Sequence, residues 1–100
     1  MPEALILEFS GVTEADYTKV NANLGIDPRT GEGDWPPGLL SHAAGTADDG
    51  TLIVIEVWSS RAEQGAFMDS RLGAALAAGG VTSMPGVRWV PLLTYHTPGA

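Results

Sequence analysis

The feature that most constrains the fold is a short acidic turn, Asp48-Asp49-Gly50, near the middle of the chain. The segments on either side of it, residues 38–47 and residues 51–58, are predominantly apolar and have the length of strands. A three-residue loop with glycine at its third, left-handed position is typical of a β-hairpin. The sequence therefore predicts two antiparallel strands joined at this turn.

The hairpin also predicts which residues face each other across the two strands. With a three-residue loop, Ala47 faces Thr51, and every other pair follows from that one. The pairs that bear on function are His42 with Glu56, Leu40 with Trp58, and Ala44 with Val54. A two-residue loop would instead place His42 beside Val57 on the other face. Glycine as the third loop residue favours the first register.

The first half of the chain predicts a strand, a helix and a long loop. Residues 4–9 are mostly aliphatic and end at a Ser-Gly pair. Thr13 can cap the helix that follows, with Asp16 as the returning half of a capping box, and Gly25 can end it. Residues 26–37 contain too much proline and glycine for regular structure. Loops of this length are often functional lids, although a plain solvated connection has the same composition.

The second half predicts another helix and a last strand. The residues from Ser60 to Glu63 form a capping-box motif, and the apolar stripe behind it predicts a helix over residues 60–79. Residues 87–94 have strand character. Pro91 cannot donate a backbone hydrogen bond, so this strand is expected at a sheet edge or a bulge.

The order strand, helix, strand, strand, helix, strand predicts a ferredoxin-like α+β fold. Two right-handed crossovers joined by the hairpin give a four-stranded antiparallel sheet with both helices on one face. The first and third strands are then central. A chain of 100 residues is enough for one domain, so residues 1–100 are expected to form a single one.

Alternation along the two central strands predicts what covers each face of the sheet. Two fully apolar sets are expected under the helices: Leu5, Leu7 and Phe9, and Ile53, Ile55 and Val57. The opposite face is expected to carry Ile6, Glu8, Leu40, Val54, Glu56 and Trp58. That face is too apolar to remain in water and no element is left to cover it, so a homodimer is expected, with a pocket between the two sheets.

Composition excludes several classes of partner and site. The formal net charge is −7, which argues against nucleic acid and against anionic membrane surfaces. The chain has no cysteine, so disulfides and thiolate chemistry are excluded. No apolar run approaches the ~20 residues of a membrane span and no basic leader is present, so a cytoplasmic location is expected. The two histidines, His42 and His96, lack a close-spaced partner, so no metal site is expected.

Residues 38–45, the Asp-Asp-Gly turn and residues 57–60 resemble small actinobacterial members of the dimeric α+β barrel superfamily, which includes the antibiotic-biosynthesis-monooxygenase-like proteins. The superfamily contains cofactor-free oxygenases that act on polyketide aromatics, haem-degrading enzymes and isomerases. The haem degraders resemble one another in an Asn near the first strand, a Trp after the third and a His on the second helix. Here Trp58 matches, but Ser10 stands near the Asn position and residues 60–80 contain no His. The resemblance thus implies no haem and no other cofactor.

Two functions follow from these residues. In the first, the protein is a cofactor-independent monooxygenase-like enzyme that acts on a small aromatic or polyketide-type compound, with His42 as general base and Glu56 fixing its tautomer. The expected binding residues are Glu8, Trp58, Leu40, Val54, Tyr17 and Trp35, with residues 26–37 closing one mouth of the barrel. In the second, the protein is a non-catalytic dimer that binds a small ligand in the same pocket or acts as an accessory protein, and His42 is a structural sheet histidine.

The two glutamates allow two arrangements as well. Glu8 and Glu56 are expected on adjacent central strands and on one face. Two carboxylates in a partly dry pocket would raise one of the two pKa values. Alternatively, both side chains reach the open rim of the dimer.

Overall fold

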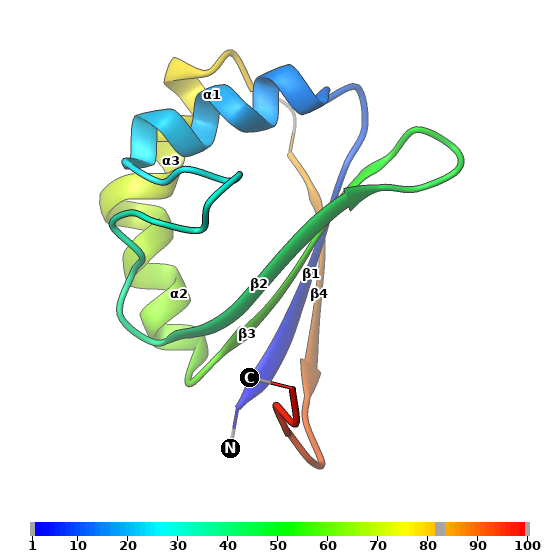
Figure 1. The fold of residues 1–100 in the computed structure, drawn as a ribbon, viewed down its shortest axis with the longest axis vertical. Helices are drawn as coiled ribbons and strands as arrows, with labels where there is room; N and C mark the ends of the chain where they lie inside the picture. The colour runs from blue at the N-terminus through cyan, green and yellow to red at the C-terminus, as the bar shows by residue number, and fades with distance from the viewer. Residues whose placement is uncertain (1, 82–83, 100) are drawn as a thin grey trace.

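Four strands form one antiparallel sheet, and the helices cover a single face of it (Figure 1). The computed structural model describes residues 2–81 and 84–99. Its elements, in chain order, are β1 (Glu3–Phe9), α1 (Glu14–Leu24), β2 (Leu39–Thr46), β3 (Leu52–Trp58), α2 (Arg61–Phe67), the π-helical turn η1 (Met68–Leu72), α3 (Gly73–Ala78) and β4 (Gly86–Pro91). The strand order β2-β3-β1-β4 places β1 and β3 at the centre, so the predicted ferredoxin-like topology is confirmed.

The hairpin between β2 and β3 has the predicted turn and, over most of its length, the predicted register. The amide of Ala47 donates to the Thr51 carbonyl at 2.9 Å, and Gly50 has the left-handed φ of 88°. His42 lies opposite Glu56. The expected pairing of Leu40 with Trp58 is wrong, because a β-bulge inserts Leu40 between two paired residues and leaves Leu39 opposite Trp58.

The register between the central strands reverses the expectation for β3. Leu5 lies opposite Glu56 and Leu7 opposite Val54, and directly opposed residues share a face of the sheet. The residues of β3 under the helices are therefore Leu52, Val54, Glu56 and Trp58, all of them buried. The prediction that Ile53, Ile55 and Val57 lie there is wrong. They lie on the uncovered face, where Ile55 is 50% exposed.

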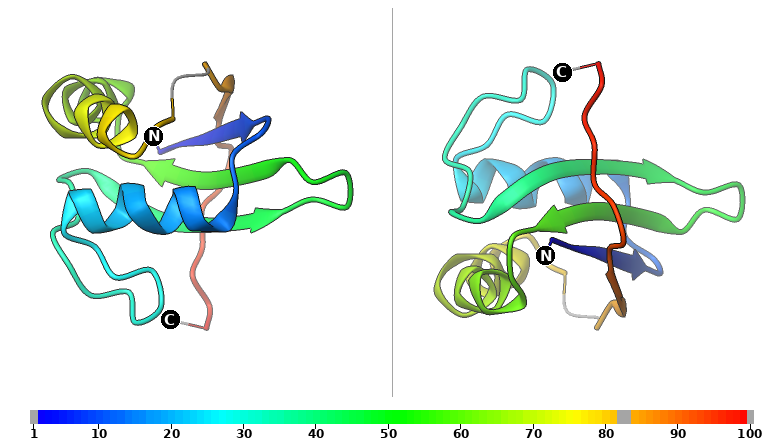
Figure 2. Two further views of the ribbon diagram at one scale, coloured as in Figure 1. Left: turned by 90° about the horizontal axis from the view of Figure 1, so that it is seen from above. Right: turned by 90° about the horizontal axis from the view of Figure 1, so that it is seen from below.

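The capping signals of α1 are confirmed. The Thr13 hydroxyl accepts from the Asp16 amide at 3.2 Å, and the Asp16 carboxylate accepts from the Thr13 amide at 3.1 Å. Gly25 ends the helix at a φ of 77°, a conformation that favours glycine. This helix lies across the sheet, beside the second helical segment (Figure 2).

The second helical segment begins as predicted and then departs from regular geometry. The Ser60 hydroxyl accepts from the Glu63 amide, but the Glu63 carboxylate accepts from the Ser60 hydroxyl rather than from its amide, so the expected capping box is only half formed. After α2 the backbone widens into η1, and the Gly73 amide closes the wide turn on the Met68 carbonyl. This π-helical turn was not predicted from the sequence.

The core lies between the sheet and the helices. Its least exposed side chains are Leu5 and Trp58, which is 0% exposed. The strand β4 pairs with β1 at the sheet edge and ends at Pro91, which agrees with the limit that proline sets on a strand. None of the helices in the described residues is long and apolar enough to cross a bilayer.

Candidate functional site

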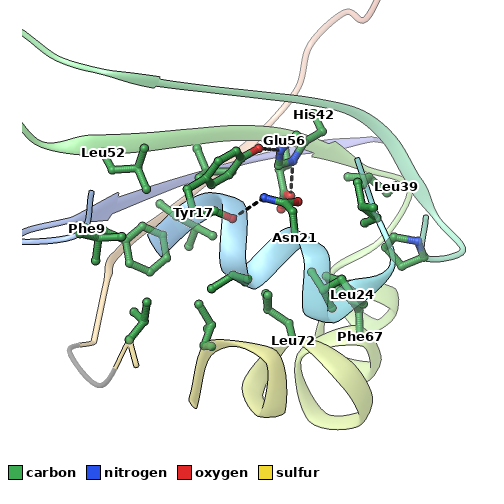
Figure 3. A pocket seen from close by; sticks show the side chains of 18 of the residues that line it. Phe9, Tyr17, Asn21, Leu24, Leu39, His42, Leu52, Glu56, Phe67 and Leu72 are labelled. Carbon is green, nitrogen blue, oxygen red and sulfur yellow. Dashed lines mark hydrogen bonds and ion pairs between the residues drawn. The ribbon is translucent and has the colours of Figure 1, made fainter. Parts of the chain in front are cut away.

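A cavity of about 70 Å³ lies inside the protein, between the sheet and the helices (Figure 3). The sheet contributes side chains from β1, β2 and β3, and the helices contribute Phe67 and Leu72 on the opposite side. Most of the lining is apolar. The polar residues that reach it are Tyr17, Asn21, His42 and Glu56.

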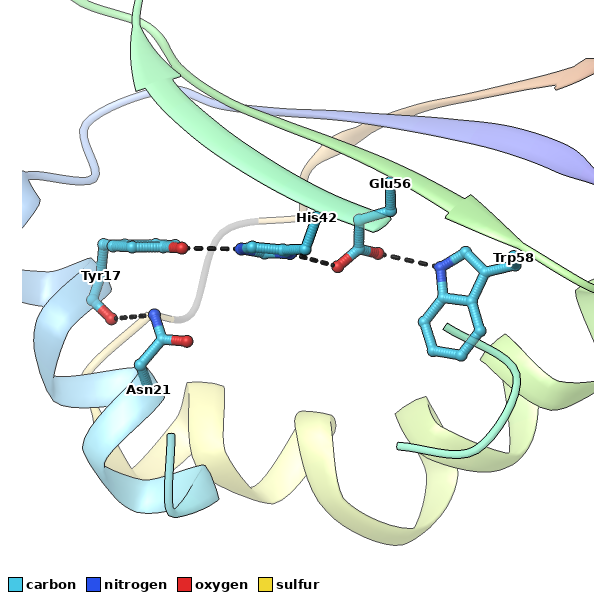
Figure 4. A network of polar contacts seen from close by, with 5 residues as sticks. All are labelled: Tyr17, Asn21, His42, Glu56 and Trp58. Atoms are coloured by element: carbon cyan, nitrogen blue, oxygen red, sulfur yellow. Dashed lines mark hydrogen bonds and ion pairs between the residues drawn. The ribbon is translucent and has the colours of Figure 1, made fainter. Parts of the chain in front are cut away.

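Three of those polar residues form a continuous chain with a buried indole (Figure 4). The Tyr17 hydroxyl lies 2.7 Å from His42 Nε2, and His42 Nδ1 lies 2.8 Å from Glu56 Oε2. The Trp58 Nε1–H donates to Glu56 Oε1 at 3.0 Å. The order along the chain is therefore Tyr17, His42, Glu56 and Trp58.

The donor and acceptor roles along this chain follow from its two ends. An indole nitrogen can only donate, so Glu56 Oε1 accepts. An ionised Glu56 accepts at its second oxygen as well, which requires a proton on His42 Nδ1. In the neutral imidazole, Nε2 then carries the lone pair, and the Tyr17 hydroxyl donates to it. The chain thus fixes one tautomer, with the basic nitrogen directed toward the cavity and Tyr17.

Strand geometry explains why these groups meet. Residues two apart on a strand point to the same face, so Glu56 and Trp58 lie together under the helices. His42 joins them because it is directly opposite Glu56 in the hairpin. On α1, Asn21 Nδ2 donates to the Tyr17 carbonyl at 2.8 Å, one helical turn away.

The Tyr17 phenol lies in a less polar setting than water. Burial raises the pKa of the Tyr17 hydroxyl, and the nearby negative charge of Glu56 raises it further. Tyr17 is therefore a neutral hydroxyl near neutral pH, which suits its role as donor to His42.

Trp35 covers His42 from the loop before β2. The two ring centroids are 5.4 Å apart, with the planes tilted by 52°. The Trp35 Nε1–H donates to the Gly31 carbonyl at 2.8 Å, so the indole is held by its own loop. Ile26, Trp35 and Pro36 of the loop thus line one side of the cavity. That residues 26–37 fold over one mouth of a barrel stays a prediction, because that barrel needs a second copy of the chain.

The structure brings together five of the eight predicted site residues: Tyr17, Trp35, His42, Val54 and Glu56 line the cavity. The contact predicted between His42 and Glu56 is present. The cavity itself was expected between two sheets, on the face away from the helices, and that placement is wrong. The alternation was assigned to the wrong face in β3, so this set moved to the helix side as a group.

The other three predicted residues lie elsewhere. Glu8 is exposed on the opposite face of the sheet, so the expected pair of carboxylates in one pocket does not form. Leu40 is 46% exposed because the bulge turns it outward. Trp58 is not part of the cavity wall; it lies behind Glu56 and holds it by a hydrogen bond.

Sequence reasoning missed Asn21, which is buried and reaches the cavity. A signal was available, because Asn21 is four residues after Tyr17 and one after Val20, on the buried stripe of α1. As for metals, the described part of the chain contains no group of three or more His, Cys, Asp or Glu side chains that could hold an ion.

No protein-family model matches the sequence, and no curated protein matches it. Solved structures match it over nearly its whole length. Rv0793 from Mycobacterium tuberculosis is 22% identical, with a TM-score of 0.63, and the match covers 97% of this chain and 100% of that one. The protein of unknown function NE2512 from Nitrosomonas europaea is 18% identical, with a TM-score of 0.62 and coverages of 99% and 96%.

A third solved structure carries a functional name. It comes from Chloroflexus aurantiacus J-10-fl and is provisionally named an antibiotic biosynthesis monooxygenase. It is 18% identical, with a TM-score of 0.62, and the match covers 96% of this chain and 98% of that one. Identities this low establish the fold alone. The chain shares the ferredoxin-like α+β fold of these three structures.

Proposed function

We propose that the protein is a cofactor-independent oxygenase that acts on a small aromatic or polyketide-type compound, with His42 as the general base. The observation that carries this proposal is the pairing of His42 with Glu56 in an otherwise apolar cavity. A carboxylate at Nδ1 keeps Nε2 as the proton acceptor and lies beside the imidazolium that forms when a proton arrives. Apolar walls favour a flat, uncharged substrate.

In this mechanism the proton reaches His42 through Tyr17. The Tyr17 oxygen accepts the proton of the substrate and passes its own proton to His42 Nε2, 2.7 Å away. The substrate is then an electron-rich anion that can transfer one electron to dioxygen, and recombination gives a hydroperoxide. Loss of water leaves a carbonyl group, so a CH₂ group and O₂ become C=O and H₂O. Protons return from the imidazolium, and neither the protein nor a cofactor changes oxidation state.

The size of the cavity sets a condition on this reaction. An engineered apolar cavity of about 150 Å³ binds benzene, so the 70 Å³ seen here is too small for an aromatic ring. Trp35 and its loop form one wall, and their outward movement would enlarge the space beside His42. The structure therefore corresponds to the closed state of the proposed enzyme.

A second candidate is a non-catalytic protein that binds a small apolar ligand in the same cavity. The hydrogen bonds already made within the chain from Tyr17 to Trp58 favour this second candidate. Within the described residues, every buried side-chain nitrogen and oxygen has a hydrogen-bond partner. A base that already has a donor at Nε2 must exchange that partner or relay through it, whereas a structural histidine needs neither.

We further propose that a second copy of the chain covers the open face of the sheet. Ile6, Ile53, Ile55 and Val57 lie on that face, and Ile55 is half exposed. Packing against a second copy would remove this surface from water and would leave one cavity in each protomer.

Oxygen consumption with a panel of hydroquinones and anthrones distinguishes the two candidates. We expect uptake by the wild type and a loss of about 100-fold or more in His42→Gln, which removes the base. His96→Gln is the matched control, because His96 is exposed and lies in the C-terminal segment. Saturable binding of these compounds with no turnover by the wild type would support the binding protein and contradict the oxygenase.

A further inference from the structure

An open groove lies next to the cavity. It has a volume of about 250 Å³ and lies between the prolines before β2 and the second helical segment. Pro36 and Phe67 line both the groove and the cavity. These two side chains therefore form the partition between the outer groove and the inner cavity beside His42.

Arg71, on the π-helical turn, lines the outer groove and holds the loop that carries the partition. Its Nη2 atom donates to the Leu24 carbonyl at 2.8 Å and to the Asp34 carbonyl at 2.7 Å. The Asp34 carboxylate lies 3.4 Å from the same nitrogen. The Arg71 side chain thus connects the last residue of α1, Leu24, to Asp34 near the end of the loop.

The same guanidinium also contacts the partition. Its central carbon lies 5.3 Å from the centre of the Phe67 ring, in a cation–π arrangement. Arg71 belongs to η1 itself. Turns of this kind are common at functional sites.

The loop between the two anchor points of Arg71 is a folded unit. Ile26 and Gly33 form a bridge, the Asp27 amide donates to the Glu32 carbonyl at 2.8 Å, and the Asp34 amide donates to the Gly25 carbonyl at 3.1 Å. Gly33 has a φ of 146°, and a Cβ there would lie 2.3 Å from the Gly25 carbonyl oxygen. The two arms of the loop are therefore tied closely together.

The two arms are anchored differently. Ile26, at the start of the loop, is buried in the core, whereas Asp34 at the other arm is exposed. Trp35 and Pro36 follow Asp34 directly. Arg71 and the bond from the Asp34 amide to the Gly25 carbonyl both hold this arm, so releasing Asp34 from Arg71 would loosen the segment that covers His42 and forms half of the partition. Ile26 would stay in the core.

We propose that the outer groove is the entrance through which a ligand reaches the inner cavity, and that Arg71 holds this entrance closed. The proposal rests on the proposed function in one respect, namely that the inner cavity binds a small aromatic compound. Breaking the bonds from Arg71 to Asp34 lets residues 34–37 move outward. The groove and the inner cavity then become one continuous space, which resolves the mismatch between the closed cavity and an aromatic ring.

Hydrogen exchange and binding kinetics of Arg71→Met test this proposal. Methionine keeps an unbranched chain against Phe67 but removes the donors. We expect the Asp34 amide, which donates to the Gly25 carbonyl, to exchange about tenfold faster, because that bond opens more often once Arg71 no longer holds the Asp34 carbonyl. The Leu7 amide in β1 should keep its rate. We expect stopped-flow association of 2-naphthol, a fluorescent aromatic alcohol, to become about tenfold faster as well.

Arg29→Met is the matched control, because the Arg29 guanidinium makes no hydrogen bond or ion pair to any residue that the structure describes. Arg71→Lys is a second variant for the case that Arg71→Met folds poorly. It keeps the cation and should give exchange and association rates between those of the wild type and those expected for Arg71→Met. If Arg71→Met has the same exchange and association rates as Arg29→Met, the proposal that Arg71 holds the entrance closed is wrong. If the Asp34 amide exchanges faster but the protein does not bind 2-naphthol, Arg71 does hold residues 34–37 in place, and the proposed function is contradicted.

Discussion

The two faces of the sheet are built from the same four strands, yet the helices cover one face and leave the other open (Figure 1). The face under the helices contains Trp58, fully buried, and a charged residue, Glu56, which is 7% exposed. The open face contains Ile53, Ile55 and Val57, which are more hydrophobic as a set and less buried. The average hydrophobicity of the side chains on a face therefore does not decide which face the helices cover. A buried carboxylate is tolerated where both of its oxygens accept hydrogen bonds, as they do from His42 and Trp58.

The largest effect expected from this comparison is on stability. Trp58→Ala should lower the free energy of unfolding by about 3–5 kcal/mol, because it empties a fully buried site and leaves Glu56 Oε1 without its donor. Ile55→Ala on the open face should cost about 1 kcal/mol or less in dilute protein. Urea denaturation measures both. Equal losses would mean that the two faces do not differ as described.

The next effect concerns assembly. If a second copy covers the open face, light scattering should give about twice the chain mass of 10.4 kDa. Ile55→Lys should reduce the mass to that of one chain, because an unpaired ammonium would be buried in the interface. The circular dichroism spectrum should keep its shape, since the helix-covered face is unchanged. A wild type that already runs as a monomer at micromolar concentration would leave the open face without its proposed partner.

A smaller effect is expected in alkaline solution. Burial raises the pKa of Tyr17 in the folded protein, so the unfolded chain releases this proton at lower pH than the folded protein does. The stabilisation is complete below the ordinary pKa of a free tyrosine, about 10, and is lost as pH rises through the folded value. Tyr17→Phe should therefore flatten the alkaline loss of stability, measured by urea denaturation between pH 8 and about pH 11. Tyr95→Phe, in the C-terminal segment, is the control; an equal flattening there would contradict the assignment to Tyr17.

The smallest effect is expected at the bulge. Leu40→Ser should change the free energy of unfolding by about 0.5 kcal/mol or less, because its side chain faces solvent at 46% exposure. Leu39→Ser, one residue earlier, should cost more because Leu39 lines the cavity. Thermal denaturation of the pair locates the bulge in solution. A larger loss at Leu40 would indicate a strand without it.

The parts of the fold that depend on neighbouring residues could be predicted from the sequence. The hairpin register followed from the third-position glycine of the turn, and it placed His42 opposite Glu56. The ends of α1 followed from Thr13 and Gly25. These features depend on local backbone chemistry, which a single sequence displays directly.

The pairing of β1 with β3 could not be predicted in the same way. It joins residues about fifty positions apart, and no turn residue fixes it. Alternation groups Glu56 with Trp58 but does not say which face the helices cover. The charge of Glu56 pointed to the wrong face, since its compensation by His42 and Trp58 exists only in three dimensions.

The π-helical turn had a signal in the sequence that regular periodicity conceals. Phe67, Leu72 and Leu76 all line the cavity, and the first two are five residues apart. An α-helix places residues three or four apart on one face, so a step of five indicates one inserted residue. Regular helical spacing of the stripe conceals this insertion, on which Arg71 lies.

The bulge at Leu40 also has a consequence for evolution and design: it uncouples the loop before β2 from the position of His42. In an uninterrupted strand, the orientation of His42 would dictate that Leu40 faces inward and Leu39 outward. The extra residue resets the phase, so Leu39 turns inward and the chain from Trp35 onward approaches the cavity independently of the hairpin. Changes in loop length can be absorbed at this position while the imidazole keeps its place beside Glu56. The loop side of the cavity can thus change while the pairing of His42 with Glu56 is kept.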